Sequence, residues 1–244
     1  MCIAILKTKN SKISRKHLEA SAENNPDGFG VAWTDGQRLR TFKTMKSGEW
    51  IDKVMSLEKS TAIIHARIRT HGETDLENCH PFRVSKGLAF IHNGCLPIST
   101  ASNGRRSDTW HFNNKVVQPL VRDVGGITPP LVELLHEYAK GSKLCFLDYR
   151  GKFIIINETA GHWAGGVWYS NASYKNSGLW WKGGGYTCPP SYYHRSPVQI
   201  VPSGGGVVPI DDDETIETMI EKDTIKKWEQ EKFHNFDSFD MGLE

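Results

Sequence analysis

Short apolar runs separated by turn-forming residues extend over the first two thirds of the chain. Their Val, Ile, Phe and Trp content and their Gly, Asp, Asn or Pro boundaries are typical of β-strands. The last two runs are joined by a turn at residues 149–151 and predict a hairpin. The runs that predict strands are CIAILK, GFGVAW, LRTFKTM, TAIIHARI, GLAFIHN, KLCFLD and FIIIN.

Three segments between these runs predict helices. Residues 14–22 begin at a serine that suits a helix N-cap, and residues 107–121 begin at Ser107 or Asp108 and carry regularly spaced apolar positions. Residues 129–141 start with proline and end with glycine, which is the usual order at the two ends of a helix. The pattern is therefore rich in strands and interrupted by helices.

The pattern changes after Trp168. Residues 176–206 are rich in Gly, Pro, Ser and aromatic residues and show no period. Residues 210–233 predict a helix with acidic residues in its first turn and lysines later, as the helix dipole favours. We expect residues 1–170 to form the main domain and residues 171–244 to form an extension packed on it.

Composition and charge argue against several classes of protein. The 244 residues include 30 basic and 28 acidic side chains, so the net charge of +2 gives no electrostatic argument for a nucleic-acid or membrane partner. No apolar run has the length of a membrane span, and the first residues lack the pattern of a secretory signal. Five widely spaced cysteines argue against a secreted disulfide framework, so we expect a cytoplasmic protein.

Polar residues with catalytic potential concentrate in residues 65–82 and 90–96, where predicted strands end. Each feature has a structural interpretation when it is taken singly. Asn-Gly is common in tight turns, an asparagine can bond its own loop, and buried histidine or cysteine can simply fill a core. The residues open to this interpretation are Cys2, His65, Asn78, His92, Asn93 and Gly94.

Two other kinds of site have weaker support. A group of zinc-type ligands is present, but neither C-x-x-C nor H-E-x-x-H occurs, and the spacing fits no familiar zinc pattern. A serine nucleophile lacks the G-x-S-x-G motif. We therefore expect no metal. The zinc-type residues are His65, His71, Cys79, His80 and His92.

A cysteine nucleophile connects these features. Cys2 follows Met1, and removal of Met1 would give Cys2 a free α-amine. That amine has a reference pKa of about 7.7–8.0, so it can accept the thiol proton near neutral pH. The side-chain amide of Asn93 and the backbone N–H of Gly94 are suitable donors to a tetrahedral oxyanion. An arginine and an acid would suit the carboxylate and ammonium groups of an amino-acid substrate.

Several blocks together resemble the class II glutamine amidotransferases, a branch of the N-terminal-nucleophile hydrolases. The family begins Met-Cys, and its next blocks read approximately HTRWATHG, N-x-HP and HNG, with Ser-Asp-Thr opening a later helix. This chain has Met1-Cys2, then HARIRTHG at 65–72, NCHP at 78–81, HNG at 92–94 and SDT at 107–109. NPDGFGVAW and LRTFK further resemble stand-alone members.

The resemblance implies a fold, a reaction and roles for single residues. The fold is an α+β four-layer αββα sandwich of two antiparallel sheets. Cys2 would attack the glutamine side-chain amide and release ammonia through a γ-glutamyl thioester, without a cofactor. Asn93 and Gly94 would form the oxyanion hole. Arg67 would bind the substrate carboxylate with help from Thr70 and His71, and Asp108 would bind the ammonium group.

The chain also departs from the family pattern. Ile3 stands where the family has glycine, Ile68 replaces an aromatic residue, and Arg69 replaces a small one. Two alternative functions therefore stay open, namely an amidohydrolase acting on another γ-glutamyl or amide substrate and a catalytically silent binding protein. No second acceptor site is predicted in the chain, so a separate synthase partner would have to supply it. We expect such a partner to dock on exposed aromatic residues between Trp163 and Tyr193.

Overall fold

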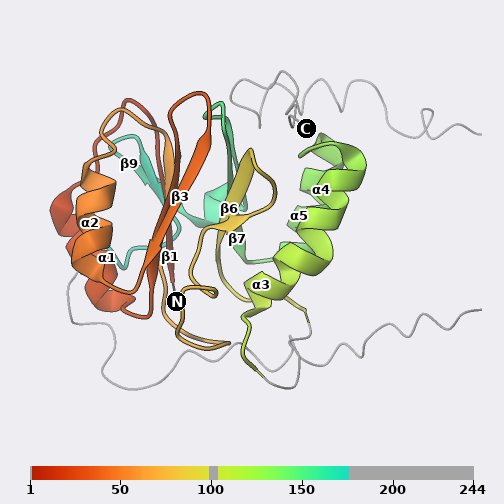
Figure 1. Ribbon diagram of the computed structural model, residues 1–244, viewed down its shortest axis with the longest axis horizontal. Helices are drawn as coiled ribbons and strands as arrows, with labels where there is room; N and C mark the ends of the chain where they lie inside the picture. The colour runs from red at the N-terminus through yellow and green to blue at the C-terminus, as the bar shows by residue number, and fades with distance from the viewer. Residues whose placement is uncertain (1, 99–103, 176–244) are drawn as a thin grey trace, which may run out of the picture.

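The computed structural model describes residues 2–98 and 104–175, and these form two antiparallel sheets enclosed between two layers of helices (Figure 1). The expected four-layer αββα sandwich is therefore confirmed. The predicted helix at residues 210–233 lies outside the described residues.

Within the described residues the larger sheet has six strands in the order β3-β2-β4-β1-β10-β9. Strand β1 lies inside this sheet, paired with β4 on one side and β10 on the other. The strands are β1 (Ile3–Lys7), β2 (Phe29–Thr34), β3 (Leu39–Thr44), β4 (Ala62–Ala66), β9 (His162–Ala164) and β10 (Val167–Tyr169).

The smaller sheet has four strands in the described part of the chain, in the order β5-β6-β7-β8. Its β7–β8 hairpin turns at residues 149–152, and Gly151 adopts a φ of +86° there, as the predicted hairpin requires. The strands are β5 (Phe82–Arg83), β6 (Leu88–Asn93), β7 (Lys143–Asp148) and β8 (Phe153–Ile156).

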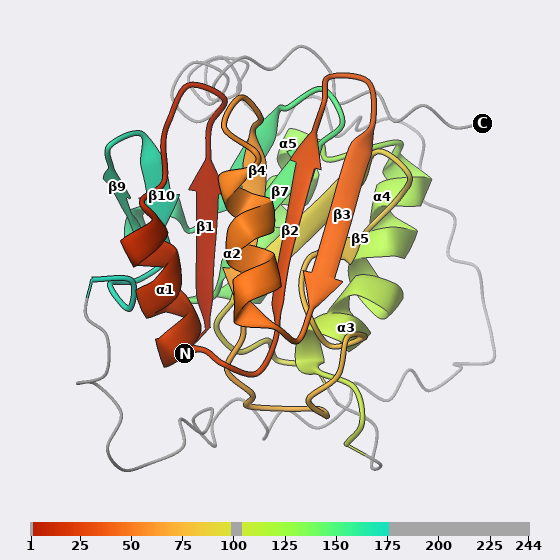
Figure 2. The same ribbon diagram turned by 60° about the vertical axis from the view of Figure 1, so that its left-hand side comes forward.

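Helices cover the outer face of each sheet. Figure 2 shows α1 (Arg15–Asn24) and α2 (Ser47–Met55) against the larger sheet, while α3 (Asp108–Phe112), α4 (Gln118–Val124) and α5 (Pro129–Ala139) lie behind the smaller one. A π-helical turn (Asn113–Val117) joins α3 to α4, and a short 3-10 turn (Glu158–Ala160) precedes β9. The sequence patterns predicted α1, α3–α4 and α5 but missed α2.

The predicted helix at 107–121 is longer and less regular in the structure, where it continues to Val124 through the π-helical turn. Pro119 has no N–H to donate to the carbonyl four residues earlier, so the regular ladder cannot pass this point unchanged. A π-turn just before the proline is one way in which a helix accommodates such a break.

Three apolar clusters hold the layers together. One lies between α1–α2 and the larger sheet, one lies between α3–α5 and the smaller sheet, and the third lies between the two sheets. The third cluster includes Trp168 of β10, which is fully buried. This central layer is the one that ends at the candidate site.

The aromatic residues that were expected to form a docking surface are mostly buried, so that prediction is wrong for the described part. Trp163 is 41% exposed, but Trp168, Tyr169 and Tyr174 are at most 2% exposed. The reason is that β10 is an interior strand, and that the rings of Tyr169 and Tyr174 stack on each other 3.7 Å apart. The rest of that stretch lies outside the described residues.

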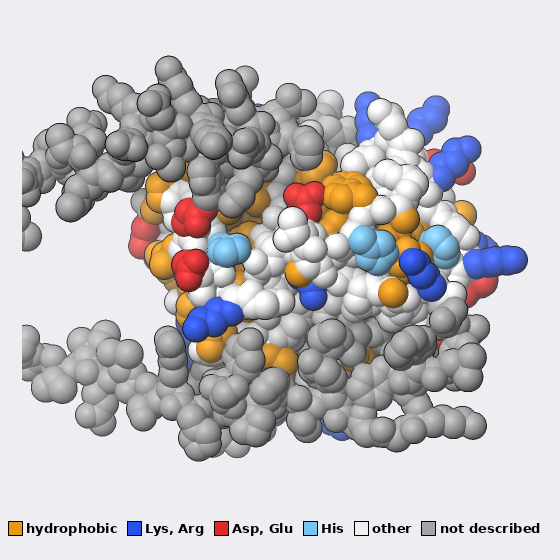
Figure 3. Space-filling model, turned by 180° about the vertical axis from the view of Figure 1, so that it is seen from behind, with side chains coloured by type: hydrophobic (Ala, Val, Ile, Leu, Met, Phe, Trp, Pro, Cys, Tyr) orange, Lys and Arg blue, Asp and Glu red, His pale blue; other side chains and the backbone are white. Residues whose placement is uncertain are grey.

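None of the helices in the described ranges is long and apolar enough to cross a membrane. In Figure 3 most Lys and Arg side chains lie toward the right-hand edge of the described surface, with a few acidic side chains among them.

Candidate active site

The alternation of side chains along three strands directs three of the predicted site residues into the space between the sheets. Every second side chain of a strand points to the same face of its sheet. By this alternation Cys2 lies on the same face as the β1 residues that pack in the central cluster, Arg67 on the same face as those of β4, and Asn93 on the same face as those of β6. Pairing of β1 with β4 brings the start of one strand beside the end of the other. These packed residues are Ala4 and Leu6 of β1, Ile63 of β4, and Ala89 and Ile91 of β6.

Cys2 is half-buried, and its sulfur contacts the backbone of Ile68. The thiol donates to the Ile68 carbonyl oxygen over 3.3 Å, and the Ile68 N–H donates to the sulfur over 3.4 Å. Burial raises the pKa of the Cys2 thiol, while the Ile68 contact and the positive charge of Arg67 act in the opposite direction and the negative charge of Asp108 raises it further. The thiol therefore needs a base to become a nucleophile.

Arg67 is 3% exposed, and its guanidinium group organises the loop that follows β4. It donates to the carbonyl of Glu73 over 2.9 Å and to the carbonyl of His71 over 2.6 Å. A guanidinium group has five N–H donors, so these two bonds leave donors for a ligand. Thr70 and His71 are half-buried in the same loop, and no hydrogen bond joins the Thr70 side chain to Cys2 within the described residues.

Asn78 ties this loop to the segment that precedes α3. Its amide group donates to the carbonyls of Glu73 and Arg105 over 3.1 and 2.8 Å, and its oxygen accepts from the Ser107 N–H over 2.8 Å. The structural interpretation of Asn78, in which it holds its own loop, is therefore confirmed. The same bonds fix the Arg67 loop relative to the start of α3.

Asp108 is the first residue of α3 and is 7% exposed. Ser107 caps this helix by accepting from the Trp110 N–H over 3.2 Å. One Asp108 oxygen accepts from the Leu96 N–H over 2.9 Å, and the other accepts from the Thr109 N–H over 2.8 Å. The carboxylate is thus held at the end of the sandwich where β1 begins, as Figures 1 and 2 both show for α3.

Asn93 ends β6 and is 1% exposed. Its amide nitrogen is placed 2.7 Å from Oγ of Ser170, which also accepts from the Ala4 N–H over 2.9 Å. The next residue, Asn171, donates to the Cys2 carbonyl over 2.8 Å. Ser170 and Asn171 follow β10 and were missed as site residues, because a single Ser-Asn pair after a short strand carries no motif.

Gly94 has a φ of +144°, which disfavours any residue with a side chain. A Cβ atom there would overlap the side chain of Ser142, which donates to the Cys95 carbonyl over 2.7 Å. Glycine is therefore required at this position both for its backbone angle and for the close approach of Ser142.

Substitution of Gly94 by alanine is expected to lower the free energy of unfolding by about 2–5 kcal/mol, because backbone strain and the overlap with Ser142 add. Gly36→Ala is the matched control, since Gly36 has a φ of +90° but open space around its Cα. Urea titration of both variants measures the difference. Equal losses in the two variants would show that the Ser142 contact costs nothing.

Three buried histidines lie beside the site. The rings of His65 and His80 stack 3.9 Å apart, and His92 stacks on His80 at 6.3 Å. His65 bonds the His92 carbonyl, His80 accepts from the His92 N–H, and His92 bonds Thr109 Oγ1 over 2.8 Å. Among the described residues no three His, Cys, Asp or Glu side chains are grouped so that they could hold a metal ion.

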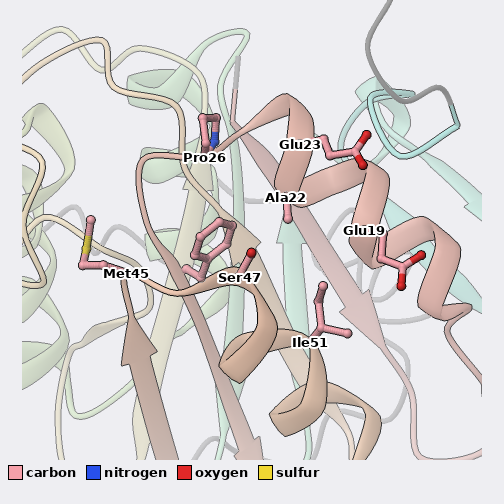
Figure 4. Close-up of a pocket in the computed structure, with 8 residues that line it drawn as sticks. Glu19, Ala22, Glu23, Pro26, Met45, Ser47 and Ile51 are labelled. Atoms are coloured by element: carbon pink, nitrogen blue, oxygen red, sulfur yellow. The ribbon is translucent and has the colours of Figure 1, made fainter.

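A pocket of about 350 Å³ opens elsewhere, between α1 and α2 on the outer face of the larger sheet (Figure 4). It contains none of the predicted site residues, and its two acidic side chains, Glu19 and Glu23, lie on α1. The pocket is therefore separate from the candidate site. Its other lining residues are Ala22, Pro26, Phe29, Met45, Ser47 and Ile51.

Comparison with known proteins yields matches in sequence and in structure. Residues 11–112 match the family model described as glutamine amidotransferases class-II. A Haemophilus influenzae protein named "Putative glutamine amidotransferase" is 32% identical over 78 residues, and the alignment covers 29% of this chain and 26% of that protein. The chain thus spans about a quarter of the length of this relative.

Two solved structures are similar at 17% identity. One is the glutamine phosphoribosylpyrophosphate amidotransferase from B. subtilis complexed with ADP and GMP, with a TM-score of 0.40 over 69% of this chain and 41% of that chain. The other is a glutamine aminotransferase class-II domain protein from Silicibacter pomeroyi, with a TM-score of 0.36 over 69% of this chain and 87% of that chain.

The family match includes Arg67, Asn93, Gly94 and Asp108 and begins after Cys2. It covers β2 to β6 and the first turns of the helical layer behind the smaller sheet. Over residues 11–112 the chain is therefore similar to the class II glutamine amidotransferases.

Proposed function

We propose that the protein is a glutamine amidotransferase-type amidohydrolase in which Cys2, exposed by removal of Met1, is the nucleophile. The observation that supports this most directly is the environment of the Cys2 sulfur, which is held by the Ile68 backbone and influenced by the charges of Arg67 and Asp108. A thiol whose pKa is raised by burial is protonated at neutral pH, so its own α-amine would take the proton.

The proposed reaction has two stages. The Cys2 sulfur forms a bond to the side-chain carbonyl carbon of glutamine while its proton moves to the α-amine. Asn93 and Gly94 stabilise the oxyanion, and the amine returns the proton to the leaving ammonia as the carbon–nitrogen bond breaks. Water then attacks the γ-glutamyl thioester, which releases glutamate and restores the thiol. No metal or organic cofactor enters the reaction.

Substrate recognition is assigned to the two buried charges. Arg67 would pair with the α-carboxylate, with Thr70 and His71 shaping the same end of the pocket, and Asp108 would pair with the α-ammonium group. Arg67 keeps N–H donors beyond its two loop carbonyls. Oδ2 of Asp108 accepts the Leu96 N–H and has a further lone pair, whereas Oδ1 accepts from both the N–H and the hydroxyl of Thr109.

The experiment that tests the proposal is release of ammonia and glutamate from glutamine by purified protein whose intact mass shows the loss of Met1. Glutamine analogues with an altered α-carboxylate or α-amine distinguish an amidotransferase from an amidohydrolase that acts on another amide. A processed protein that binds glutamine without turnover would favour a silent binding protein on the same scaffold.

Arg67→Lys is expected to raise the KM for glutamine by about 10- to 100-fold with a smaller change in kcat, because an ammonium group cannot reproduce the bidentate guanidinium contact. Arg69→Lys is the control, since Arg69 is exposed and its backbone N–H, rather than its side chain, is bound among the described residues, to Asp27 over 2.7 Å. Steady-state kinetics decide the matter. An unchanged KM in Arg67→Lys would remove Arg67 from substrate binding.

An acceptor partner remains part of the proposal. Class II amidotransferases act on glutamine, and we propose that this chain alone releases ammonia and aminates nothing, with a separate synthase supplying the acceptor. Incubation with amide-¹⁵N glutamine, ATP and a metabolite extract tests this. Label that enters a metabolite in the presence of the pure protein alone would show that the chain carries its own acceptor site.

A further inference from the structure

In the present orientation of the Asn93 side-chain amide, two polar groups lack a hydrogen-bond partner among the described residues. They are the amide oxygen of Asn93 and the hydroxyl proton of Ser170. The Asn93 nitrogen donates to Ser170 Oγ, and its oxygen Oδ1 is buried without a hydrogen-bond partner among the described residues. Ser170 Oγ then accepts twice, from Asn93 and from the Ala4 N–H. A serine hydroxyl has one donor as well, and within the described residues it has no recorded acceptor.

Exchanging the amide oxygen and nitrogen of Asn93 gives the Ser170 hydroxyl proton an acceptor. Ser170 would still accept from Ala4 and would now donate to Asn93 Oδ1. The 2.7 Å separation is typical of an O–H···O bond and short for an N–H···O bond. The two ends of an asparagine amide are distinguished by their hydrogen-bond network, so this network determines the assignment.

The exchange also changes what the site offers to a ligand. The buried position at which Oδ1 finds no donor among the described residues would now hold the NH₂ group with its N–H donors. Asn93 continues the β6 residues that face the larger sheet, and Cys2 continues the β1 residues that face the smaller one. The unpaired donors therefore belong to the layer in which the Cys2 sulfur lies.

We infer that Ser170 is a positioning residue whose hydroxyl donates to Asn93 Oδ1 and thereby holds the Asn93 NH₂ group toward the oxyanion formed at Cys2. This inference rests on the proposed function and deepens it. The same hydroxyl accepts from the N–H of Ala4, two residues after Cys2, so a single group links the strand of the nucleophile to the strand of the oxyanion donor. Asn171 adds a bond to the Cys2 carbonyl.

A double-mutant cycle tests this role. Asn93→Ala is expected to lower kcat by about 10²–10³-fold. Ser170→Ala is expected to lower kcat by about 10-fold or more with KM little changed, and to have almost no further effect in the Asn93→Ala background. Ser21→Ala is the matched control, because Ser21 is equally buried and donates to the His17 carbonyl within α1.

The outcomes separate the inference from the proposed function. Wild-type kinetics in Asn93→Ala would overturn the oxyanion role of Asn93 and with it the inference. A normal kcat in Ser170→Ala, or equal and independent losses in the single and double variants, would overturn the inference and leave the proposed function standing.

A measurement on the wild-type protein covers the case in which Ser170→Ala fails to fold or glutamine is not turned over. The side-chain NH₂ signals of Asn93 in a ¹⁵N–¹H spectrum are assigned by their loss in Asn93→Asp. We expect neither proton to show the downfield shift of a short hydrogen bond in the ligand-free protein. A strongly downfield proton would show that the nitrogen donates to Ser170 and would overturn the inference.

Discussion

Cys2→Ala is expected to abolish the release of ammonia and glutamate from glutamine, with a loss in kcat of about 10⁴-fold or more. The thiol sulfur is the atom that would form the acyl bond, and removal of a nucleophile that acts together with its base removes the whole covalent route. The Cys2 side chain bonds only the Ile68 backbone within the described residues, so the variant is expected to fold. Steady-state assays and a thermal melt measure both quantities.

Labelling identifies the nucleophile independently of turnover. A diazo-ketone analogue of glutamine is expected to alkylate Cys2, whereas Cys79 and Cys145 are fully buried with thiol pKa values raised by burial. Peptide mapping after labelling locates the adduct. An adduct on Cys79, Cys95 or Cys145 with none on Cys2, or full activity in Cys2→Ala, would contradict the assignment.

The role of the α-amine has its own control. A chain that carries an uncleaved residue before Cys2 keeps the thiol but replaces the amine by an amide, which cannot accept a proton. We expect this chain to be nearly inactive and to be labelled far more slowly. Activity equal to that of the processed protein would show that another group removes the thiol proton.

Local patterns predicted the longer strands because these are continuous apolar runs between clear turn residues. The two-residue β5 and the three-residue β9 were not predicted. Helix α2 was missed, although Trp50, Ile51 and Val54 are buried on one of its faces. The helix is only nine residues long and Gly48 lies near its start, so the helix propensity of this segment is low. Packing of these three side chains on the larger sheet stabilises it.

The candidate site was predictable where residues form a motif with fixed spacing, and less so where contacts join distant segments. Ser170 lies 77 residues from Asn93 and 166 from Ala4. Pairing of β10 with β1 brings it to Ala4, and packing of the two sheets on each other brings it to Asn93. Likewise, the sequence could not indicate that the Arg67 guanidinium group donates hydrogen bonds to the carbonyls of His71 and Glu73. Such bonds depend on tertiary structure, which local patterns do not encode.

The structural interpretation of His65 and His92 as buried histidines agrees with their exposed fractions of 0% and 3%, but the sequence did not reveal that both stack with His80. Burial lowers the pKa of His65 to about 3 and that of His92 to about 4, and it holds the pKa of His80 well below its usual value. The charges of Arg67 and Lys43 also lower the pKa values of His65 and His80, whereas Asp108 raises that of His92 and Lys143 lowers it. All three rings are therefore neutral in the folded protein at neutral pH.

Acid is expected to unfold the protein steeply between about pH 6.5 and 4. Above pH 6.5 these histidines are neutral in both the folded and the unfolded chain, so they do not make the free energy of unfolding depend on pH. Below it the unfolded chain binds protons that the folded chain does not, and each histidine removes about 1.4 kcal/mol of unfolding free energy per pH unit. The three histidines together give the free energy of unfolding a slope of about 4 kcal/mol per pH unit. A typical free energy of unfolding is lost within a few pH units at this slope.

Urea titrations at pH 7.5, 6.5, 5.5 and 5 measure this slope. His80→Asn is expected to reduce it by about 1.4 kcal/mol per unit, because asparagine can still accept from the His92 N–H but does not titrate. His136→Asn, at a histidine on α5 whose side chain is 48% exposed, is the matched surface control. If the unfolding free energy were constant from pH 7.5 to 5, the three rings would have to accept protons in the folded state, and the buried stack would not be neutral.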